Sequence, residues 1–155
     1  MAGESPAAYA RRVAVDKAIE VAAQVDPRAV IVAADTVVVL GQGLLQKPAS
    51  PAEARRMLRS LSGRWHEVIT GLCVLGPRRM RVFTGRTRVQ FKKLSAEAID
   101  TYVATGEPMD KAGAYAIQGK GSFMVRAVRG SYTNVVGLPV AELVEILEKD
   151  FGIRL

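Results

Sequence analysis

Apolar residues recur along this chain in two different periods, and the changes of period mark out its elements. Residues 6–24 place apolar side chains at helical spacing behind Ser5 and Pro6, a capping residue and a first-turn proline, so we expect a helix there. Residues 29–40 are apolar almost throughout, which is typical of a strand covered on both faces. A tight turn and a short return over 41–48 should follow.

Residues 50–63 form the most sharply delimited helix in the sequence. Ser50 is the expected cap, Pro51 stands at the first helical position, Glu53 completes a capping box, and Gly63 is the stop. This local chemistry predicts both ends of the helix.

The rest of the chain mixes strands with helices. The expected elements are a hairpin of strands over 65–75 and 80–94, a helix over 95–106, a glycine-punctuated loop over 107–121, a strand over 122–130 and a closing helix over 138–152. Their order favours an α/β fold with a mixed, twisted sheet flanked by helices. No linker or repeat interrupts the pattern, so we predict a single domain over residues 1–155.

Composition places the chain among ordinary globular proteins, with 49% hydrophobic and 24% charged residues. No apolar run approaches the roughly 18 residues that span a bilayer, and the first residues lack the apolar segment of a secretory signal. Cys73, the one cysteine, cannot form an internal disulfide, which fits the cytoplasm, and we interpret it as a small apolar strand residue.

The net charge of +7 fits anionic partners such as a phosphorylated small molecule. Within the most basic segment, Arg88 and Lys92 alternate with Val89 and Phe91, as on the solvated face of a half-buried strand. Few aromatic residues interleave with these charges, so nucleic acid is not a favoured partner.

Asp35 is the residue that fits the pattern least. An ionised carboxylate inside an apolar strand is costly unless it is paired, hydrogen-bonded or bound to a metal. One interpretation is a bulge at Asp35 and Thr36, where the acid accepts backbone N–H groups. The other is a functional site.

Two lysines are also out of place. Lys17 lies within the apolar stripe of the first helix, where it could either extend its ammonium into water or bind a ligand. Lys47 follows a tight turn, where a lysine is usually just solvated. Together, one acid and two ammonium groups suit a polyphosphate held with a divalent metal, since carboxylates ligate Mg²⁺ and lysines attract phosphate.

The loop over 107–121 adds glycines that could let backbone approach a ligand, together with the side-chain amide of Gln118. It matches neither of the common glycine-rich phosphate-binding fingerprints. His66 is the single histidine, which disfavours zinc and Ser-His or Cys-His catalysis, and we interpret it as a strand residue with a satisfied ring.

Four stretches carry a resemblance to a known family: "AADTVVVL", "KPASPAEARRMLRSLSGRWHEVITG", "YVATGEPMDKAGAYAIQGKG" and "GSYTNVVGLPVAEL". In this order they resemble the Maf nucleoside triphosphate pyrophosphatases, over nearly the whole chain. The resemblance implies a fold similar to inosine triphosphate pyrophosphatases, with a cleft between two lobes. It also implies metal-dependent hydrolysis of a nucleoside triphosphate to the monophosphate and pyrophosphate, a homodimer, and an association with septum formation.

The resemblance also implies residue roles. Asp35 corresponds to the general base or metal-site acid, and Glu4 to a second acidic residue near the metal, which would be Mg²⁺ with Mn²⁺ as an alternative. Lys17 and Lys47 would hold phosphates, while Gln118 and Thr36 would lie near the base or the water. The motifs are more similar to the branch that prefers dTTP and UTP than to the branch that acts on 7-methyl-GTP.

The chain departs from the family pattern at its start. Members begin with a strand and a Ser-x-Ser-Pro-Arg-Arg loop that grips the triphosphate, whereas this sequence begins with "MAGESP". Relative to the family, the chain is therefore expected to be truncated at its N-terminus, to have had its start assigned too far downstream, or to work without this loop. The alternative to an active pyrophosphatase is a nucleotide-binding regulatory or inactive module without the arginine loop. A third interpretation, a nucleic-acid-binding protein, is supported only by the net positive charge.

Overall fold

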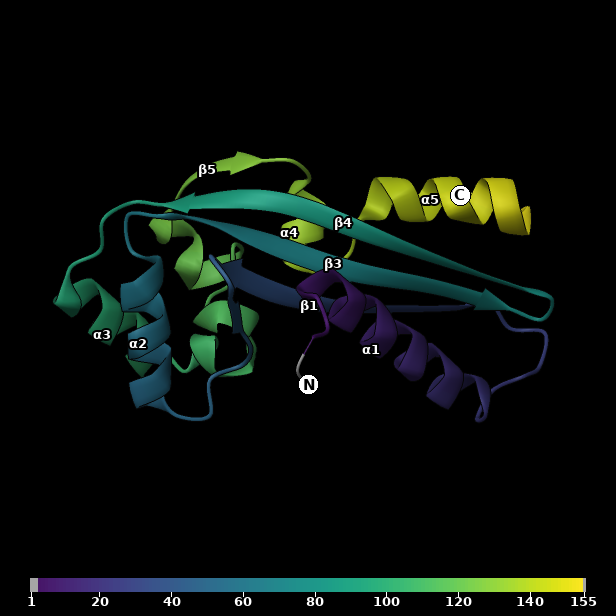
Figure 1. Ribbon diagram of the computed structural model, residues 1–155, viewed down its shortest axis with the longest axis horizontal. Helices are drawn as coiled ribbons and strands as arrows, with labels where there is room; N and C mark the ends of the chain where they lie inside the picture. The colour runs from purple at the N-terminus through teal and green to yellow at the C-terminus, as the bar shows by residue number, and fades with distance from the viewer. Residues whose placement is uncertain (1–2, 155) are drawn as a thin grey trace. The chain divides into compact units, whose positions relative to one another are not determined.

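The computed structural model describes residues 3–154, in which helices and strands alternate irregularly along the chain (Figure 1). The elements are α1 (Pro6–Ala22), β1 (Ile31–Leu40), β2 (Gly43–Leu45), α2 (Pro51–Leu61), β3 (Trp65–Gly76), β4 (Arg79–Phe91), α3 (Ala96–Ala104), the 3₁₀ turns η1 (Glu107–Asp110), η2 (Ala112–Ala114) and η3 (Gly119–Met124), β5 (Val125–Arg129), α4 (Tyr132–Val136) and α5 (Val140–Phe151). No helix among these residues is long and apolar enough to cross a membrane.

Five strands form one antiparallel sheet in the order β2-β1-β3-β4-β5. β1 pairs with β2 through Val38 and Leu45, and β4 pairs with β5 through Arg88 and Arg129. The α/β class is confirmed, but the prediction of a mixed sheet is wrong. Two-residue turns join β1 to β2 and β3 to β4, and connections this short are possible between antiparallel strands and not between parallel ones.

The expected helix starts are confirmed. The Oγ atoms of Ser5, Ser50 and Ser95 each accept the backbone N–H of the residue three positions later, at 3.1–3.2 Å. At α2 the Glu53 carboxylate accepts the N–H of Ala49 at 2.7 Å, so the return bond of the expected capping box reaches the residue before the Ser50 cap. The serine bonds satisfy N–H groups that the first turn of a helix leaves without partners.

Two expectations for the later chain need correction. The strand expected over 122–130 begins at Val125, because residues up to Met124 wind into η3. The expected loop over 107–121 is wound into 3₁₀ turns, and α4 was not anticipated. Both differences concern single helical turns, which are too short to show a period in the sequence.

The chain separates into two compact units. The first contains the residues up to Thr36, Ile69–Gly85 and the residues from Thr133 onward, and the second contains Val37–Val68 and Arg86–Tyr132. Each unit is described in its own right, and the single domain over 1–155 stays a prediction.

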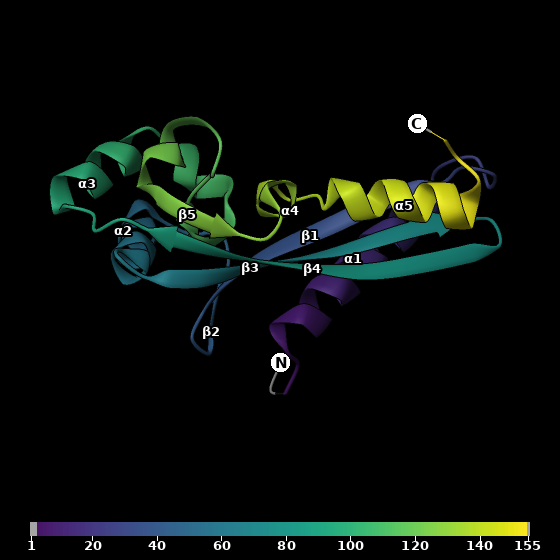
Figure 2. The same cartoon turned by 90° about the horizontal axis from the view of Figure 1, so that it is seen from above.

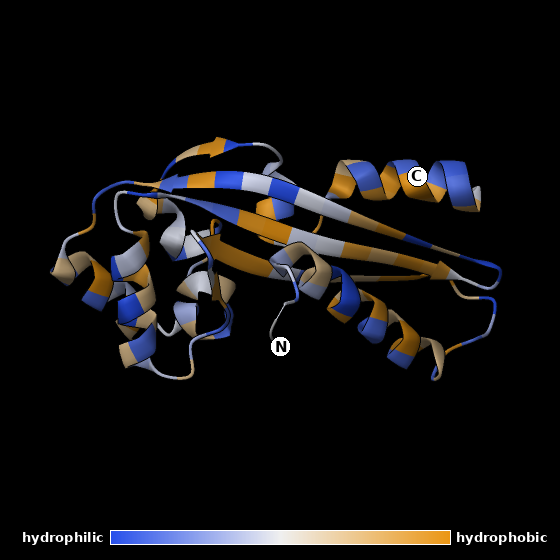
Figure 3. Ribbon diagram, viewed as in Figure 1, coloured by the Kyte–Doolittle hydropathy of each residue, from blue (hydrophilic) through white to orange (hydrophobic). Residues whose placement is uncertain are grey.

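In the first unit, β3 is covered on both faces. Cys73 and Leu75 pack with Ala14 and Ala18 of α1, whereas Leu72 and Val74 pack with α5. Figure 2 shows α1 and α5 on opposite sides of these strands, and Figure 3 shows α5 banded with apolar and hydrophilic residues, as its one-sided burial requires. The continuous apolar run of β3 therefore has a simple cause, because successive side chains enter different cores.

Gly71 sets how closely α1 approaches β3. A Cβ atom at this position would lie 2.4 Å from the backbone carbon and oxygen of Ala10. Ala10, Ala14 and Ala18 are fully buried on the same side of the helix. Small side chains on both elements thus allow the helix backbone to lie directly on the strand.

Replacing Gly71 by Ala should destabilise the fold by about 2 kcal/mol or more, because the added methyl group meets backbone that cannot rotate away. Urea unfolding measures the loss. Gly43→Ala is the matched control, since its Cβ would meet nothing closer than 3.4 Å. A Gly71→Ala protein as stable as the parent would contradict the close approach.

The second unit contains an aromatic cluster that joins β3 and β4 to the segment after η2. His66, Phe91 and Tyr115 contact one another edge to face, with ring centroids 4.7–5.4 Å apart. Leu58 and Leu61 of α2 are fully buried. This core holds the ends of β3 and β4 to the turns that follow α3.

Candidate functional site

Asp35 and Lys17 form an ion pair in the first unit. Ile31 and Ala33 of β1 pack on the side of the sheet covered by α1. Since side chains of a strand alternate between faces, Asp35 lies on this same side. Its Oδ1 accepts a hydrogen bond from Lys17 Nζ at 2.7 Å. Two of the three residues that looked out of place in the sequence are therefore partners.

The ion pair is accessible to a ligand. The side chains of Lys17 and Asp35 keep 49% and 19% of their exposure, so the acid is not fully buried as its strand suggested. Lys17 Nζ also donates to the carbonyl oxygen of Ala34 at 3.1 Å. An ammonium has three N–H bonds, which leaves one to donate to an anion.

The expected acceptance of backbone N–H groups by Asp35 is wrong among the described residues, because its hydrogen-bond partner there is Lys17. β1 runs as strand through Asp35 and Thr36. The acid is compensated by a charge on α1, which holds Oδ1 and leaves Oδ2 for another partner.

Thr36 faces the other side of the sheet and joins a hydroxyl chain. Its Oγ1 lies 2.9 Å from Oγ1 of Thr70, and the Thr70 hydroxyl donates to the carbonyl oxygen of Asn134 at 2.9 Å. A hydroxyl has one hydrogen, so the Thr36 hydroxyl is the donor to Thr70. The Thr36 oxygen then keeps lone pairs that can accept a hydrogen bond from a further partner. Sequence reasoning missed Thr70, although a polar residue within the apolar run of β3 was a signal.

Glu4, which lies just before α1, is paired with Arg12 on that helix. Both carboxylate oxygens accept from the guanidinium at 2.9 Å, and this hydrogen bonding holds the pKa of Glu4 below its usual value. The bidentate pair is the geometry that arginine and carboxylate prefer. A metal at Glu4 would share the carboxylate with Arg12, so its role as a metal ligand stays a prediction.

The residues of the first unit fit a metal that arrives with its substrate better than a permanently held ion. No three His, Cys, Asp or Glu side chains gather into a metal-binding group between residues 3 and 154. Mg²⁺, however, often takes one or two carboxylates and completes its shell with water and substrate phosphates. Asp35, with Oδ2 not hydrogen-bonded to the described residues, suits that arrangement.

Lys47 and Gln118 belong to the second unit. Lys47 is exposed, and its chain segment is tied to η2 by the Gly113 N–H, which donates to the Gln46 carbonyl oxygen at 3.1 Å. Lys47 also contributes, after Lys111, to lowering the pKa of Asp110. Gln118 is exposed at the start of η3. Within this unit, both residues lie on segments that backbone bonds hold in place.

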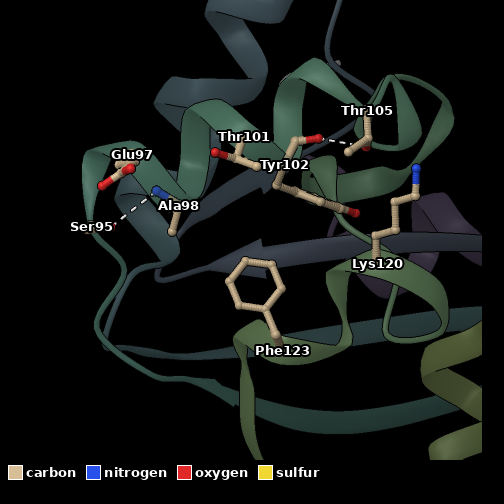
Figure 4. Close-up of a pocket in the computed structure, with 8 residues that line it drawn as sticks. All are labelled: Ser95, Glu97, Ala98, Thr101, Tyr102, Thr105, Lys120 and Phe123. Carbon is tan, nitrogen blue, oxygen red and sulfur yellow. Dashed lines mark hydrogen bonds between the residues drawn. The ribbon is translucent and has the colours of Figure 1, made fainter.

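A cavity of about 480 Å³ lies between α3 and η3 in the second unit (Figure 4). Tyr102, Lys120 and Phe123 contribute to its lining, but Lys47 and Gln118 do not. The cavity therefore lies beside the segment that carries Gln118 and does not include the side chains that the sequence singled out.

His66 is buried and does not serve the candidate site. Its Nε2 lies 2.8 Å from the Tyr115 hydroxyl oxygen, while Nδ1 has no hydrogen-bond partner in the part of the chain that the structure describes. The interpretation of a satisfied ring is therefore only half right. Burial lowers the pKa of His66 to about 4, so the ring is neutral at pH 7.

The stability of the protein should fall as the pH drops from about 6.5 towards 4. In that window the unfolded chain binds a proton at His66 that the folded chain does not, and the pKa difference amounts to about 3 kcal/mol. His66→Gln is the control, because its amide does not titrate there. Urea unfolding should show the stability difference between parent and variant shrinking over this window, and a constant difference would refute the assignment.

Comparisons with known proteins identify relatives of this chain. The family described as "Maf-like protein" matches residues 2–150. A dTTP/UTP pyrophosphatase from Koribacter versatilis is 50% identical over 148 residues, covering 96% of this chain and 76% of the relative. One from Nitratidesulfovibrio vulgaris is 55% identical over 146 residues, covering 94% and 69%. One from Geobacter sulfurreducens is 52% identical over 149 residues, covering 95% and 78%.

Proposed function

Because the chain belongs to the Maf family, we propose that it is a nucleoside triphosphate pyrophosphatase that hydrolyses dTTP and UTP. The observation that carries the proposal is the ion pair between Lys17 and Asp35. It places a carboxylate and an ammonium group with a remaining N–H side by side at an accessible position. These are the two chemical functions that hydrolysis of a phosphoanhydride needs from side chains.

In the proposed reaction, water attacks the α-phosphorus. The water oxygen forms a bond to phosphorus, the bond from this phosphorus to the bridging oxygen breaks, and pyrophosphate leaves with that oxygen. Asp35 accepts a proton from the attacking water. Lys17 supports this role because its Nζ donates a hydrogen bond to Asp35 Oδ1 at 2.7 Å. This bond orients the carboxylate and so restricts the directions from which Asp35 can take the proton.

Lys17 has a second role in this proposal. Two of its hydrogens are given to Asp35 and to the Ala34 carbonyl oxygen, and the third is available to a phosphate oxygen. Lys47 would also hold phosphates, as the resemblance implies. Gln118 and Thr36 would contact the base or the water, and the hydroxyl chain through Thr70 supports Thr36 as an acceptor there.

A divalent metal, Mg²⁺ or Mn²⁺, would be held by Asp35 with Glu4 as a second acid. When bound, such an ion neutralises charge on phosphate oxygens and makes the phosphorus easier to attack. The fold similar to inosine triphosphate pyrophosphatases, the cleft between two lobes, the homodimer, the cytoplasmic location and the link to septum formation stay predictions from the resemblance.

Asp35→Asn should lower kcat for dTTP and UTP by roughly 10²- to 10⁴-fold, the usual contribution of a general base. The amide keeps the size of the side chain but neither accepts the proton nor balances Lys17. Pyrophosphate release with the purified protein is the measurement. Asp26→Asn is the control, since Asp26 is an exposed aspartate of the same unit that pairs with Arg28. Equal rates for Asp35→Asn and the parent would exclude Asp35 as the base.

Removing divalent metal with EDTA should reduce turnover by about 10²-fold or more, and added Mg²⁺ should restore it, because the charge on the phosphate oxygens is then neutralised again. The initial rate of pyrophosphate release with and without metal measures this effect. Unchanged turnover after exhaustive chelation would show that the reaction does not need a divalent metal.

A further inference from the structure

We propose that Tyr102 and Glu107 act as positioning residues for Gln118, by clamping the backbone on both sides of it. This inference rests on the proposed function, in which Gln118 contacts the base or the water. The clamp consists of the Tyr102 hydroxyl and the Glu107 carboxylate, both in the second unit.

Four hydrogen bonds build the clamp. The Tyr102 hydroxyl accepts the N–H of Ala116 at 3.2 Å and donates to Glu107 Oε1 at 3.0 Å. Glu107 Oε1 also accepts the N–H of Gly121 at 3.1 Å, and Oε2 accepts that of Lys120 at 3.1 Å. The segment is therefore held two residues before Gln118 and two and three residues after it.

The clamp has a rigid base. The Tyr102 side chain belongs to α3 and is 2% exposed, so packing fixes its ring. The Thr105 hydroxyl donates to the Tyr102 carbonyl oxygen at 2.7 Å and accepts the Glu107 N–H at 3.2 Å. Figure 4 shows the hydroxyl end of Tyr102 directed towards the segment that carries Lys120. Tyr102 lies in the last turn of α3 and Glu107 opens η1 shortly after it, so both arms of the clamp start from one short stretch of chain.

Two glycines of the loop are needed for this arrangement. A Cβ at Gly119, where φ is +78°, would lie 3.0 Å from Glu107 Oε2. A Cβ at Gly121 would lie 2.7 Å from the Tyr102 hydroxyl oxygen. The sequence suggested that these glycines let the backbone approach a ligand. In the structure they let it approach the clamp.

The charge of Glu107 strengthens the clamp. Burial raises the pKa of this carboxyl, but the N–H groups of Lys120 and Gly121 outweigh it and hold the pKa below its usual value. A carboxylate accepts stronger hydrogen bonds than a neutral oxygen. Gln118 itself is exposed, so its position depends on the backbone that the clamp holds.

Hydrogen exchange without any nucleotide tests the clamp itself. Tyr102→Phe should accelerate amide exchange at Ala116 by about fivefold or more. Glu107→Gln should do the same at Lys120 or Gly121, because the amide keeps one oxygen acceptor and turns the other position into a donor. Glu97→Gln, an exposed glutamate on α3, is the matched control and should leave all three amides protected. Unchanged exchange in both clamp variants would overturn the proposal.

A double-mutant cycle tests the link to Gln118. Alone, Tyr102→Phe and Glu107→Gln should each lower kcat/KM for dTTP by about 10- to 100-fold, as displaced catalytic groups do. In a Gln118→Ala background the same changes should cost no more than about twofold, because the group they position is already gone.

The outcomes separate the two proposals. A parent protein that hydrolyses neither dTTP nor UTP would overturn the proposed function. A parent that hydrolyses them, but loses activity equally in both backgrounds, would overturn the positioning role alone and leave Tyr102 and Glu107 as general stabilisers. Parent activity in Gln118→Ala would also overturn it.

Discussion

The close approach of α1 to β3 at Gly71 is the constraint on which the candidate base depends. A lysine side chain reaches about four methylene groups from its helix, so the separation between helix and sheet decides what its ammonium can contact. This separation is small because the side chains at the contact are small, namely Ala10, Ala14 and Ala18 on α1, and because Gly71 on β3 has no side chain. Lys17, on the turn next to Ala14, can then donate to both Asp35 and the Ala34 carbonyl oxygen. An apolar contact thus determines the geometry of an ion pair.

The alternation of side chains along β1 separates the two polar residues at its centre. Asp35 follows Ile31 and Ala33 onto the side of α1, where an ammonium group balances its charge. Thr36 turns to the opposite side, where the hydroxyl of Thr70 fixes its hydrogen. Each polar group therefore has a partner suited to its chemistry, and neither leaves an uncompensated charge or donor in the strand.

Sequence alone predicted what depends on neighbouring residues. The caps at Ser5, Ser50 and Ser95 were evident, because the groups that make them lie within four positions. The sequence also flagged Asp35 and Lys17 separately as out of place. It could not show that they are partners, since that depends on how a helix lies on a sheet. The strand order of the sheet and the bond between Tyr102 and Ala116 were missed because they join residues that are distant in sequence.

The roles of the glycines could not be predicted from the sequence either, because they depend on which atoms a side chain at each position would contact. Gly71 admits a helix, and Gly119 and Gly121 admit the carboxylate and hydroxyl of the clamp. In each case two segments of the chain lie in close contact. The backbone that carries a long polar side chain nearby, Lys17 or Gln118, is thereby held in place. Lysine and glutamine lose much conformational entropy when a ligand orders them. Holding the backbone that carries them in advance reduces the part of the cost that comes from ordering the chain, so contacts that do not touch a ligand can still favour its binding.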